Sequence, residues 1–228
     1  MTTFDPDRDL EHVELDLPPL SVRLRTVRDP EALYDRFLEL GDEHPDYQDE
    51  RIPYWAELWP SAIALARFVA REGLARPGVA VTEIGCGFGL CGIAAALLGA
   101  QVVLSDYSPD ALAFARANFA LNRASSQAAE PRYVQMDWRT PDPTFAADLV
   151  LASDVVYERR ALEWLPGALA TLIRPAGRAL VAEPGRSVAE PLPDLLRARG
   201  LTASELAIVP IVYGSRSARV RILEVTHA

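Results

Sequence analysis

Three alternating glycines follow a short apolar segment in this chain, and they constrain its fold more than any other feature. Residues 81–89 read VTEIGCGFG, and the apolar residues after them predict a helix over 90–98. Glycine lets the backbone approach a ligand closely because it carries no Cβ atom. The first N–H groups of the following helix are free to bind a negatively charged group. The segment therefore predicts a strand, a tight turn and a helix that together bind a nucleotide-type cofactor.

The glycine pattern alone leaves the cofactor open. In the frame that starts at Gly85 and Gly87, the dinucleotide pattern G-x-G-x-x-G fails, because Leu90 stands at its third glycine. Gly87, Gly89 and Gly92 satisfy the pattern, but this shifted frame requires two extra residues after the strand. The choice of cofactor therefore depends on residues further along the chain.

Length and composition predict one large domain. The chain has 228 residues, of which 50% are hydrophobic, so it can bury a sizeable core. Its formal net charge of -9 repels phosphate backbones, and we expect no nucleic-acid partner. All 23 basic residues are arginine. The absence of lysine excludes Schiff-base chemistry and a phosphate-loop lysine.

The cysteines and histidines indicate neither disulfides nor a metal site. The chain has two cysteines, Cys86 and Cys91, and two cysteines do not make a disulfide framework. The expected location is therefore the reducing cytoplasm. His12, His44 and His227 are scattered, so no metal site is expected. The N-terminus is polar and acidic, and no apolar run reaches membrane-spanning length. We expect neither a signal peptide nor an association with membranes.

The first 50 residues show little periodicity. They predict a short strand over 20–25 and a short helix over 31–40. An acidic, turn-rich segment follows, for which we consider two interpretations, a solvated loop and a docking surface for a basic protein. We predict that residues 1–50 form an N-terminal extension that packs on a main domain of residues 51–228. The carboxylates of the acidic segment are Asp42, Glu43, Asp46, Asp49 and Glu50.

From residue 51 onward, strands and helices alternate. The last two strands are joined by a short turn, which predicts an antiparallel pair. Ser61 is expected to cap the first helix of this part. The alternation predicts an α/β fold, a Rossmann-like doubly wound sheet of seven strands that is mainly parallel. The expected strands span 80–84, 101–105, 132–136, 148–152, 178–182, 203–212 and 218–226. Helices are expected over 61–72, 90–98 and 192–199, and two more are expected to begin near residues 108 and 161.

Four carboxylates stand at or near the ends of four expected strands. They are Glu83, Asp106, Asp137 and Asp154. In open α/β sheets, ligands bind beyond the carboxyl ends of the strands. Asp106 follows Gly85 by 21 positions, close to the spacing of about 20 at which an acidic residue reaches a ribose diol. Each carboxylate alone could be a turn or cap residue, but together they predict a ligand site.

Two of these strand ends also carry aromatic residues. Asp137 can accept a hydrogen bond from an adenine amino group, while the backbone of Trp138 borders the ring. Asp154 and Tyr157 follow the fourth strand, where a substrate would meet the cofactor. An acidic and an aromatic side chain there can orient an amine and line a narrow channel. The alternatives are a loop-capping Asp137 and a buried Tyr157.

These residues together resemble the motifs of the class I S-adenosylmethionine-dependent methyltransferases. Glu83, Gly85, Gly87 and Gly89 are similar to the first motif of that class. The resemblance implies S-adenosylmethionine as the cofactor, with Asp106 as the ribose ligand. It also implies cofactor contacts from Trp59, Tyr107, Asp137, Trp138 and Ser153.

Two further segments narrow the resemblance. Residues 53–61, PYWAELWPS, are similar to the tryptophan-bearing segment ahead of the first motif in the seven-strand protein lysine methyltransferases. Residues 154–157, DVVY, are similar to the D-x-x-Y signature of those enzymes. Within the group, the chain resembles the branch that includes the electron-transfer-flavoprotein β-subunit lysine methyltransferases, over about residues 50–228. The resemblance implies methyl transfer to a lysine amine, with Asp154 orienting the amine and Tyr157 lining the channel as the catalytic residues.

Other functions remain open at this point. Adenine and glutamine amino-methyltransferases carry Asn-Pro-Pro-Tyr where this chain has DVVY, which argues against methylation of bases or glutamine. The alternatives are a small-molecule N-methyltransferase, an NAD-dependent oxidoreductase that uses the shifted glycine frame, and a cofactor-binding protein without activity. The acceptor is a protein or small-molecule amine, and the sequence does not specify the oligomeric state.

Overall fold

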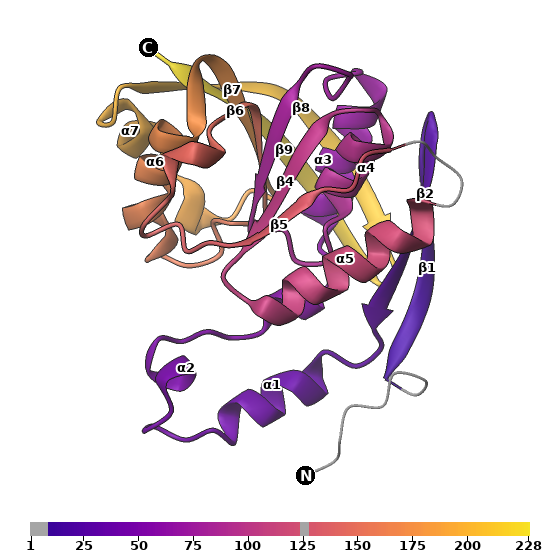
Figure 1. Ribbon diagram of the computed structural model, residues 1–228. Coiled ribbons are helices and arrows are strands. Elements are labelled where there is room, and N and C mark those ends of the chain that lie inside the picture. The colour runs from indigo at the N-terminus through magenta and orange to yellow at the C-terminus, as the bar shows by residue number, and fades with distance from the viewer. Residues whose placement is uncertain (1–8, 124–127) are drawn as a thin grey trace.

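The computed structural model describes residues 9–123 and 128–228. A seven-stranded sheet lies between two groups of helices, with a two-stranded sheet beside it (Figure 1). The order in the large sheet is β5-β4-β3-β6-β7-β9-β8, with β3 to β7 parallel and β9 antiparallel to both of its neighbours. This confirms the predicted fold class. The strands are β3 (Ala80–Ile84), β4 (Gln101–Asp106), β5 (Arg132–Gln135), β6 (Ala147–Ser153), β7 (Ile173–Glu183), β8 (Leu201–Tyr213) and β9 (Arg216–His227).

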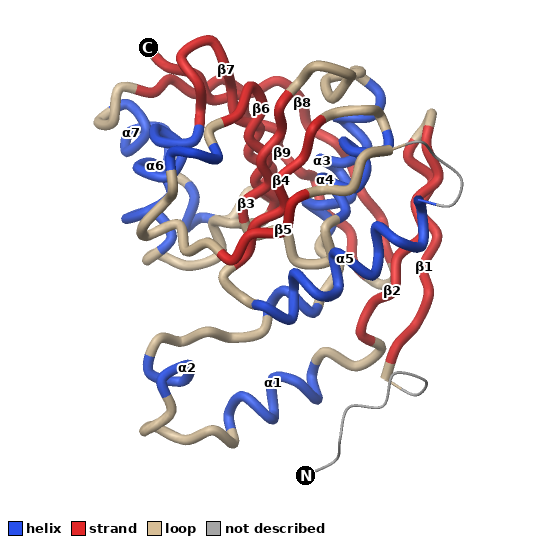
Figure 2. The backbone as a smooth tube through the Cα atoms, viewed as in Figure 1, coloured by secondary structure: helices blue, strands red, loops and turns tan. Residues whose placement is uncertain are grey.

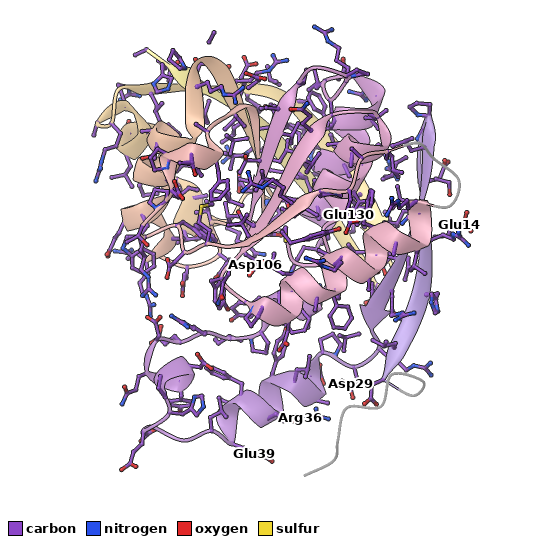
Figure 3. All side chains as sticks on the ribbon, in the orientation of Figure 1. Glu14, Asp29, Arg36, Glu39, Asp106 and Glu130 are labelled. Carbon is purple, nitrogen blue, oxygen red and sulfur yellow. The ribbon has the colours of Figure 1, made fainter. Side chains whose placement is uncertain are left out.

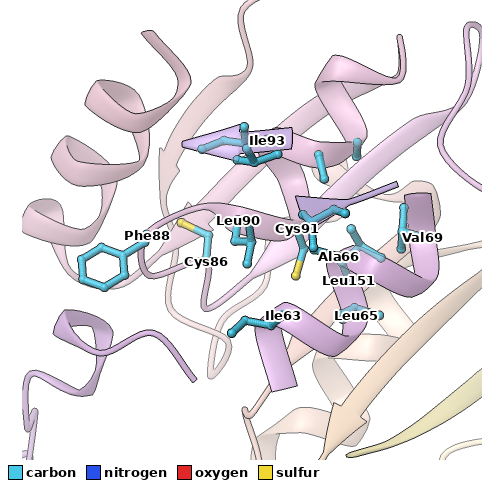
Figure 4. Close-up of a cluster of buried hydrophobic side chains, with 14 of the residues drawn as sticks. Ile63, Leu65, Ala66, Val69, Cys86, Phe88, Leu90, Cys91, Ile93 and Leu151 are labelled. Atoms are coloured by element: carbon cyan, nitrogen blue, oxygen red, sulfur yellow. The ribbon is translucent and has the colours of Figure 1, made fainter. Parts of the chain in front are cut away.

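Helices cover both faces of this sheet because its parallel strands are apolar on both sides. A cluster of buried side chains joins one face to α3, α4 and α5, and it includes Leu65, Leu104 and Phe119. Figure 4 shows the part of this cluster between α3 and α4. A second cluster, with Leu165 and Leu196, joins the other face to α6 and α7. The helices are α3 (Pro60–Arg71), α4 (Leu90–Leu97), α5 (Pro109–Arg123), α6 (Ala161–Leu172) and α7 (Leu192–Arg197).

The N-terminal part forms a β-hairpin, of which only the second strand was predicted from the sequence. β1 (Leu10–Leu17) pairs antiparallel with β2 (Leu20–Val27), whereas a single strand over 20–25 was expected. Buried Leu17 and Leu24 belong to the same cluster as α3 to α5. The side chains of Asn118 and Asn122 on α5 accept hydrogen bonds from backbone N–H groups of β2, at 2.7 and 2.9 Å. The helix thus takes the place of a third strand at the edge of the hairpin.

A segment with two short helices leads from the hairpin back to the large sheet (Figure 2). It contains α1 (Glu31–Leu38) and α2 (Pro45–Gln48), of which only the first was predicted. We call residues 41–52 the strap. In the described residues, no helix is long and apolar enough to cross a membrane. Residues 1–8, on which the expectation of no signal peptide rests, lie outside them.

The start of α3 differs from the prediction. The helix begins at Pro60 with Trp59 as its N-cap, so Ser61 is not the cap. Proline favours the first helical position because its φ angle is already helical and it lacks an N–H group. The Ser61 hydroxyl is therefore free for a contact elsewhere, described below. At α5, by contrast, a serine does cap the helix, because Ser108 Oγ accepts a hydrogen bond of 3.4 Å from the N–H of Ala111.

Candidate cofactor and acceptor site

A cavity of about 300 Å³ opens at the carboxyl ends of β3, β4 and β6. Its size is within the range of ligand pockets in proteins. Tyr54, Glu57 and Arg186, which were not predicted, also line it. Of the predicted site residues, Glu83, Gly89 and Asp137 lie outside its lining. The predicted residues that do line it are Trp59, Gly85, Gly87, Asp106, Tyr107, Trp138, Ser153, Asp154 and Tyr157.

The glycine turn folds tightly between β3 and α4. Gly89 has a φ of 82°, and a Cβ atom there would lie 2.9 Å from the Cβ of Ala115. Gly92 is needed for another reason, since a Cβ atom on it would lie 2.2 Å from Cδ2 of Leu104. That glycine lets α4 pack against β4, which explains why the shifted glycine frame occurs in this chain.

Glu83 lies behind the turn, against the start of α4. Its Oε2 accepts a hydrogen bond of 2.7 Å from the N–H of Gly92, one of the donors that a helix start leaves unpaired. The side chain is 1% exposed, and burial raises its pKa to about 8, although the bond from Gly92 opposes this shift. The geometry gives Glu83 a role in fixing the glycine turn, and its predicted contact with a cofactor stays a prediction.

Asp106 connects the glycine turn to the start of α5, and Figure 3 labels it there. One carboxylate oxygen accepts from the N–H of Gly87 and the other from the N–H of Ser108, both at 3.0 Å. Burial raises the pKa of Asp106 to about 6, although these backbone bonds oppose the shift. Each oxygen of an ionised carboxylate has a further lone pair, so Asp106 can still accept from hydroxyl groups of a ligand.

Two aromatic side chains border the same part of the cavity. Tyr107 follows β4, and its hydroxyl donates a hydrogen bond of 3.3 Å to the carbonyl oxygen of Ile52 in the strap. Trp138 follows β5, and its ring lies 3.4 Å from where a Cβ on Gly85 would be. Flat apolar faces beside a carboxylate suit a ligand that contains a ribose and a base.

Asp137 lies in a smaller neighbouring cavity. Its carboxylate accepts hydrogen bonds from the side chain of Arg139 at 2.6 and 2.8 Å, and from its backbone N–H at 2.9 Å. The guanidinium binds Oδ2, whereas Oδ1 accepts the backbone bond and has a further lone pair for an adenine amino group. The role of Asp137 as the adenine ligand stays a prediction.

Two carboxylates of the acidic strap bind it to the loop after β5 and to the start of α6. Both carboxylate oxygens of Asp49 accept from Arg139, each at 2.8 Å. Glu50 accepts from Arg160, also at 2.8 Å. Each of these guanidinium groups lies 5.4 Å from the ring of Trp164. The Arg139 guanidinium also holds the pKa of Asp49 below its ordinary value.

Asp154 lies in the turn after β6 and lines the same cavity as Asp106. Its Oδ2 accepts a hydrogen bond of 2.9 Å from the hydroxyl of Ser61. Its Oδ1 accepts from Nε and Nη2 of Arg186, at 3.2 and 3.0 Å. Asp154 also has a φ of 53°, which is uncommon for a residue other than glycine. The backbone and three donors therefore fix this carboxylate at the cavity wall.

Three aromatic side chains line the cavity together with Asp154, and we call this part of the cavity the channel. The rings of Tyr54 and Tyr157 meet edge to face with centroids 5.1 Å apart. Trp59 Nε1 donates a hydrogen bond of 2.9 Å to the carbonyl oxygen of Tyr54. The guanidinium groups of Arg186 and Arg216 lie 5.8 and 4.9 Å from the Trp59 ring. Such a channel can hold an extended apolar chain with an amine at its end.

The site does not contain the parts of other common mechanisms. In the described part of the chain, no three His, Cys, Asp or Glu side chains are grouped so that they could hold a metal ion. Burial raises the pKa of both Cys86 and Cys91 well above the ordinary value, so neither is a ready thiolate nucleophile. The arrangement instead combines a nucleotide-type cavity with a fixed carboxylate in the same wall.

The strand order, the glycine turn after β3 and the acidic residue at the end of β4 define a Rossmann-like methyltransferase fold. The solved structure of magnesium protoporphyrin IX methyltransferase from Synechocystis PCC 6803, which holds bound SAM, is similar with a TM-score of 0.59. It is 19% identical, and the match covers 89% of this chain and 99% of that one. At this identity the likeness shows the fold alone.

Sequence comparison identifies the family. The model described as lysine methyltransferase matches residues 48–191, and the chain belongs to this family. It is 33% identical to the electron transfer flavoprotein beta subunit lysine methyltransferase of Danio rerio over 147 residues, 64% of this chain and 55% of that protein. It is 30% identical to EEF1A lysine methyltransferase 3 of Mus musculus, over 80% of this chain and 77% of that protein. The chain thus spans only about half the length of the Danio rerio relative.

Proposed function

We propose that this protein is an S-adenosylmethionine-dependent methyltransferase that methylates lysine side chains of another protein. The observation that carries the proposal is the shared cavity, which is lined by Asp106 as well as by Asp154 and Tyr157. A nucleotide-type cofactor and an acceptor amine can therefore meet inside one enclosed space. Membership in the lysine methyltransferase family supports the same reaction.

The residues of the cavity fit this cofactor. We propose that Asp106 accepts hydrogen bonds from its ribose hydroxyls, and that Tyr107 and Trp138 border its adenine ring. The turn of residues 85–89 would hold the methionine part, since its glycines leave room for a ligand against the backbone. S-adenosylmethionine supplies a methyl group bound to a positively charged sulfur. We propose further contacts from Trp59, Glu83, Asp137 and Ser153.

The acceptor amine must arrive in line with that methyl group and without its proton. Its nitrogen lone pair forms the new N–C bond while the S–C bond breaks, and the bonding pair stays on sulfur to leave S-adenosylhomocysteine. Asp154 orients the amine, and Tyr157 with Trp59 lines the channel and excludes water. The proton of the incoming ammonium goes to solvent before the channel is filled.

A protein acceptor is favoured over a small molecule by the names of the relatives, which are lysine methyltransferases of an electron transfer flavoprotein subunit and of EEF1A. A small-molecule amine fits the same cavity and is the alternative. The oxidoreductase alternative conflicts with the family match. The chain itself has no lysine, so it cannot methylate its own lysine side chains.

We further propose a cytoplasmic location and no membrane or nucleic-acid partner. Cys86 and Cys91 are both free thiols and both buried, which is usual in a reducing compartment. The net charge of -9 opposes binding to phosphate backbones.

Two measurements test the proposed function. Calorimetric titration with S-adenosylhomocysteine, and in parallel with NADH, is expected to show micromolar binding of the first alone. Purified protein is then incubated with labelled S-adenosylmethionine and a cell lysate, and labelled proteins are searched for methyllysine by mass spectrometry. The Asp154→Ala variant is the control for contaminating activity. Label on small molecules only would favour the alternative, and binding of NADH alone would contradict the proposal.

A further inference from the structure

Arg186 forms the charged partner of the carboxylate that we assign to the acceptor site. The side chain of Asp154 is only 5% exposed and that of Arg186 is 35% exposed. Two guanidinium nitrogens of Arg186 contact the same oxygen of Asp154. A buried carboxylate requires a partner of opposite charge, and Arg186 supplies it before any acceptor is present.

The backbone fixes Arg186 in this place. Glu183, at the end of β7, accepts from the N–H of Gly185 at 2.6 Å and from the N–H of Arg186 at 3.1 Å. Glu183 is itself buried and pairs with Arg221 on β9. The turn after β7 is therefore held by a buried ion pair, and the guanidinium of Arg186 reaches the acceptor side from a rigid base.

The charge beside an amine decides whether it keeps its proton. A carboxylate close to an amine raises the pKa of that amine, and a cation close to it lowers that pKa. Only the neutral amine has the lone pair that methyl transfer requires. An unpaired Asp154 would thus hold a lysine in its unreactive ammonium form.

We propose that Arg186 is a positioning residue that neutralises Asp154, so that the channel receives the acceptor amine in its neutral form. This inference rests on the proposed function. A second neutral pair faces the same channel, because Glu57 accepts hydrogen bonds from both Arg216 and Tyr34. Ser61 occupies the remaining oxygen of Asp154 without adding charge. The other titratable groups that line the cavity are Tyr54, Cys86, Asp106, Tyr107 and Tyr157, and Glu183 lies behind Arg186.

The proton balance of amine binding tests this inference directly. The probe is n-butylamine, which copies the lysine side chain, added to protein saturated with S-adenosylhomocysteine near pH 9, about one unit below the ordinary pKa of a lysine amine. Calorimetry in two buffers with different ionisation enthalpies counts the protons released. The wild-type protein is expected to release about one proton per amine bound, because the amine arrives as ammonium and is held neutral.

Matched variants separate the charge of Arg186 from its other contacts. Arg186→Gln is expected to release almost no protons, because the unpaired Asp154 then binds the ammonium ion. The double variant Asp154→Asn with Arg186→Gln has a neutral site again and is expected to release about one proton, as the wild type does. Arg197→Gln removes a guanidinium from an exposed ion pair with Asp194 that does not line the cavity, and it is expected to behave as the wild type.

The opposing results are equally definite. Equal proton release by the wild type and Arg186→Gln overturns the inference, and so does an Arg197→Gln variant that matches Arg186→Gln. The inference is also overturned if the wild-type protein binds no n-butylamine, or releases no proton when it binds the amine. These two results need no variant, so the test stays valid if a variant fails to fold. None of these results depends on the acceptor, whereas the proposed function fails if no methyllysine is formed in a lysate.

Discussion

The hydroxyl of Ser61 donates a hydrogen bond of 2.9 Å to Oδ2 of Asp154 and joins the first turn of α3 to the turn after β6. Both side chains are buried. The two residues are 93 positions apart and belong to the two segments, 53–61 and 154–157, that resemble lysine methyltransferase motifs. These segments are therefore two parts of one wall, and Ser61 adds an uncharged donor to a carboxylate whose charge Arg186 balances.

Replacing Ser61 by alanine is expected to lower stability and turnover together. The variant leaves one oxygen of a buried carboxylate without its protein donor, which costs about 1–3 kcal/mol of unfolding free energy. Urea denaturation measures this loss, and calorimetry is expected to show little change in S-adenosylhomocysteine affinity. Ser21→Ala removes an exposed hydrogen bond to Glu14 and is the control, with an expected change within about 0.5 kcal/mol. Equal losses in both variants would contradict the role of Ser61.

Replacing Asp154 by alanine is expected to abolish methyl transfer while S-adenosylhomocysteine still binds. The reason is that we assign Asp154 to the acceptor amine, whereas Asp106 is the residue that we assign to the cofactor ribose. Turnover is measured with labelled cofactor, and affinity by calorimetry on the same preparation. If affinity falls as far as turnover does, Asp154 belongs to the cofactor site and its assigned role is wrong.

The parts of the fold that repeat a local pattern were predictable, and the parts held by distant partners were not. β3 to β9 follow apolar runs between turn residues, and the structure has all seven strands. β1 was missed, although Val13, Leu15 and Leu17 alternate with charged residues as the apolar residues of β2 do. The hairpin depends on Asn118 and Asn122 of α5, which lie 93 and 99 positions from their partners on β2.

The same distinction holds for the candidate site. Asp106 and Asp154 were predictable because they stand at carboxyl ends of parallel strands, which meet at one edge of the sheet. Arg186 was missed because the segment Glu183-Pro184-Gly185-Arg186 indicates only a turn, and its ion pair spans 32 positions. A basic residue after the fifth parallel strand was the available signal, since that strand ends at the same edge.

Cofactor affinity is expected to fall in acid because of Asp106. Burial raises the pKa of this carboxyl to about 6, so it is ionised above that pH and protonated below it. A protonated carboxyl is a poorer acceptor for ribose hydroxyls. The affinity for S-adenosylhomocysteine should therefore weaken below about pH 6, by up to about tenfold per pH unit. Asp106→Asn should bind weakly at pH 7 without this decline, and an equal decline in both proteins would assign it to another group.

Glu83 is expected to lower the free energy of unfolding as the pH rises from 4.5 to about 8. Its pKa is raised from 4.5 to about 8 by burial, so the native state holds a proton that the unfolded chain releases between these values. The contribution of Glu83 to unfolding free energy is full below pH 4.5 and declines as pH rises to about 8, by about 1.4 kcal/mol for each unit of pKa difference. Glu83→Gln keeps an acceptor for Gly92 and should flatten this decline in urea titrations across that pH range. An unchanged slope would show that Glu83 is ionised in the folded protein.

The strap is expected to control how fast the cofactor product leaves. Asp49 accepts hydrogen bonds from both terminal nitrogens of the Arg139 guanidinium, beside the cavity wall formed by Tyr107 and Trp138. Arg139→Gln removes this two-point contact, which is worth about 1 kcal/mol at a partly exposed site, or roughly a fivefold change in rate. Stopped-flow displacement of S-adenosylhomocysteine should show this faster release, and added salt should speed release from the wild type more than from the variant.

An exposed ion pair elsewhere gives the control for this last prediction. Arg197 on α7 pairs with Asp194 at 2.8 Å, and both side chains are largely exposed. Arg197→Gln changes the net charge by the same amount as Arg139→Gln but leaves the strap bound to the sheet. Its release rate and salt dependence should match those of the wild type. If the two variants behave alike, the strap does not limit product release, and the contact between Asp49 and Arg139 serves stability alone.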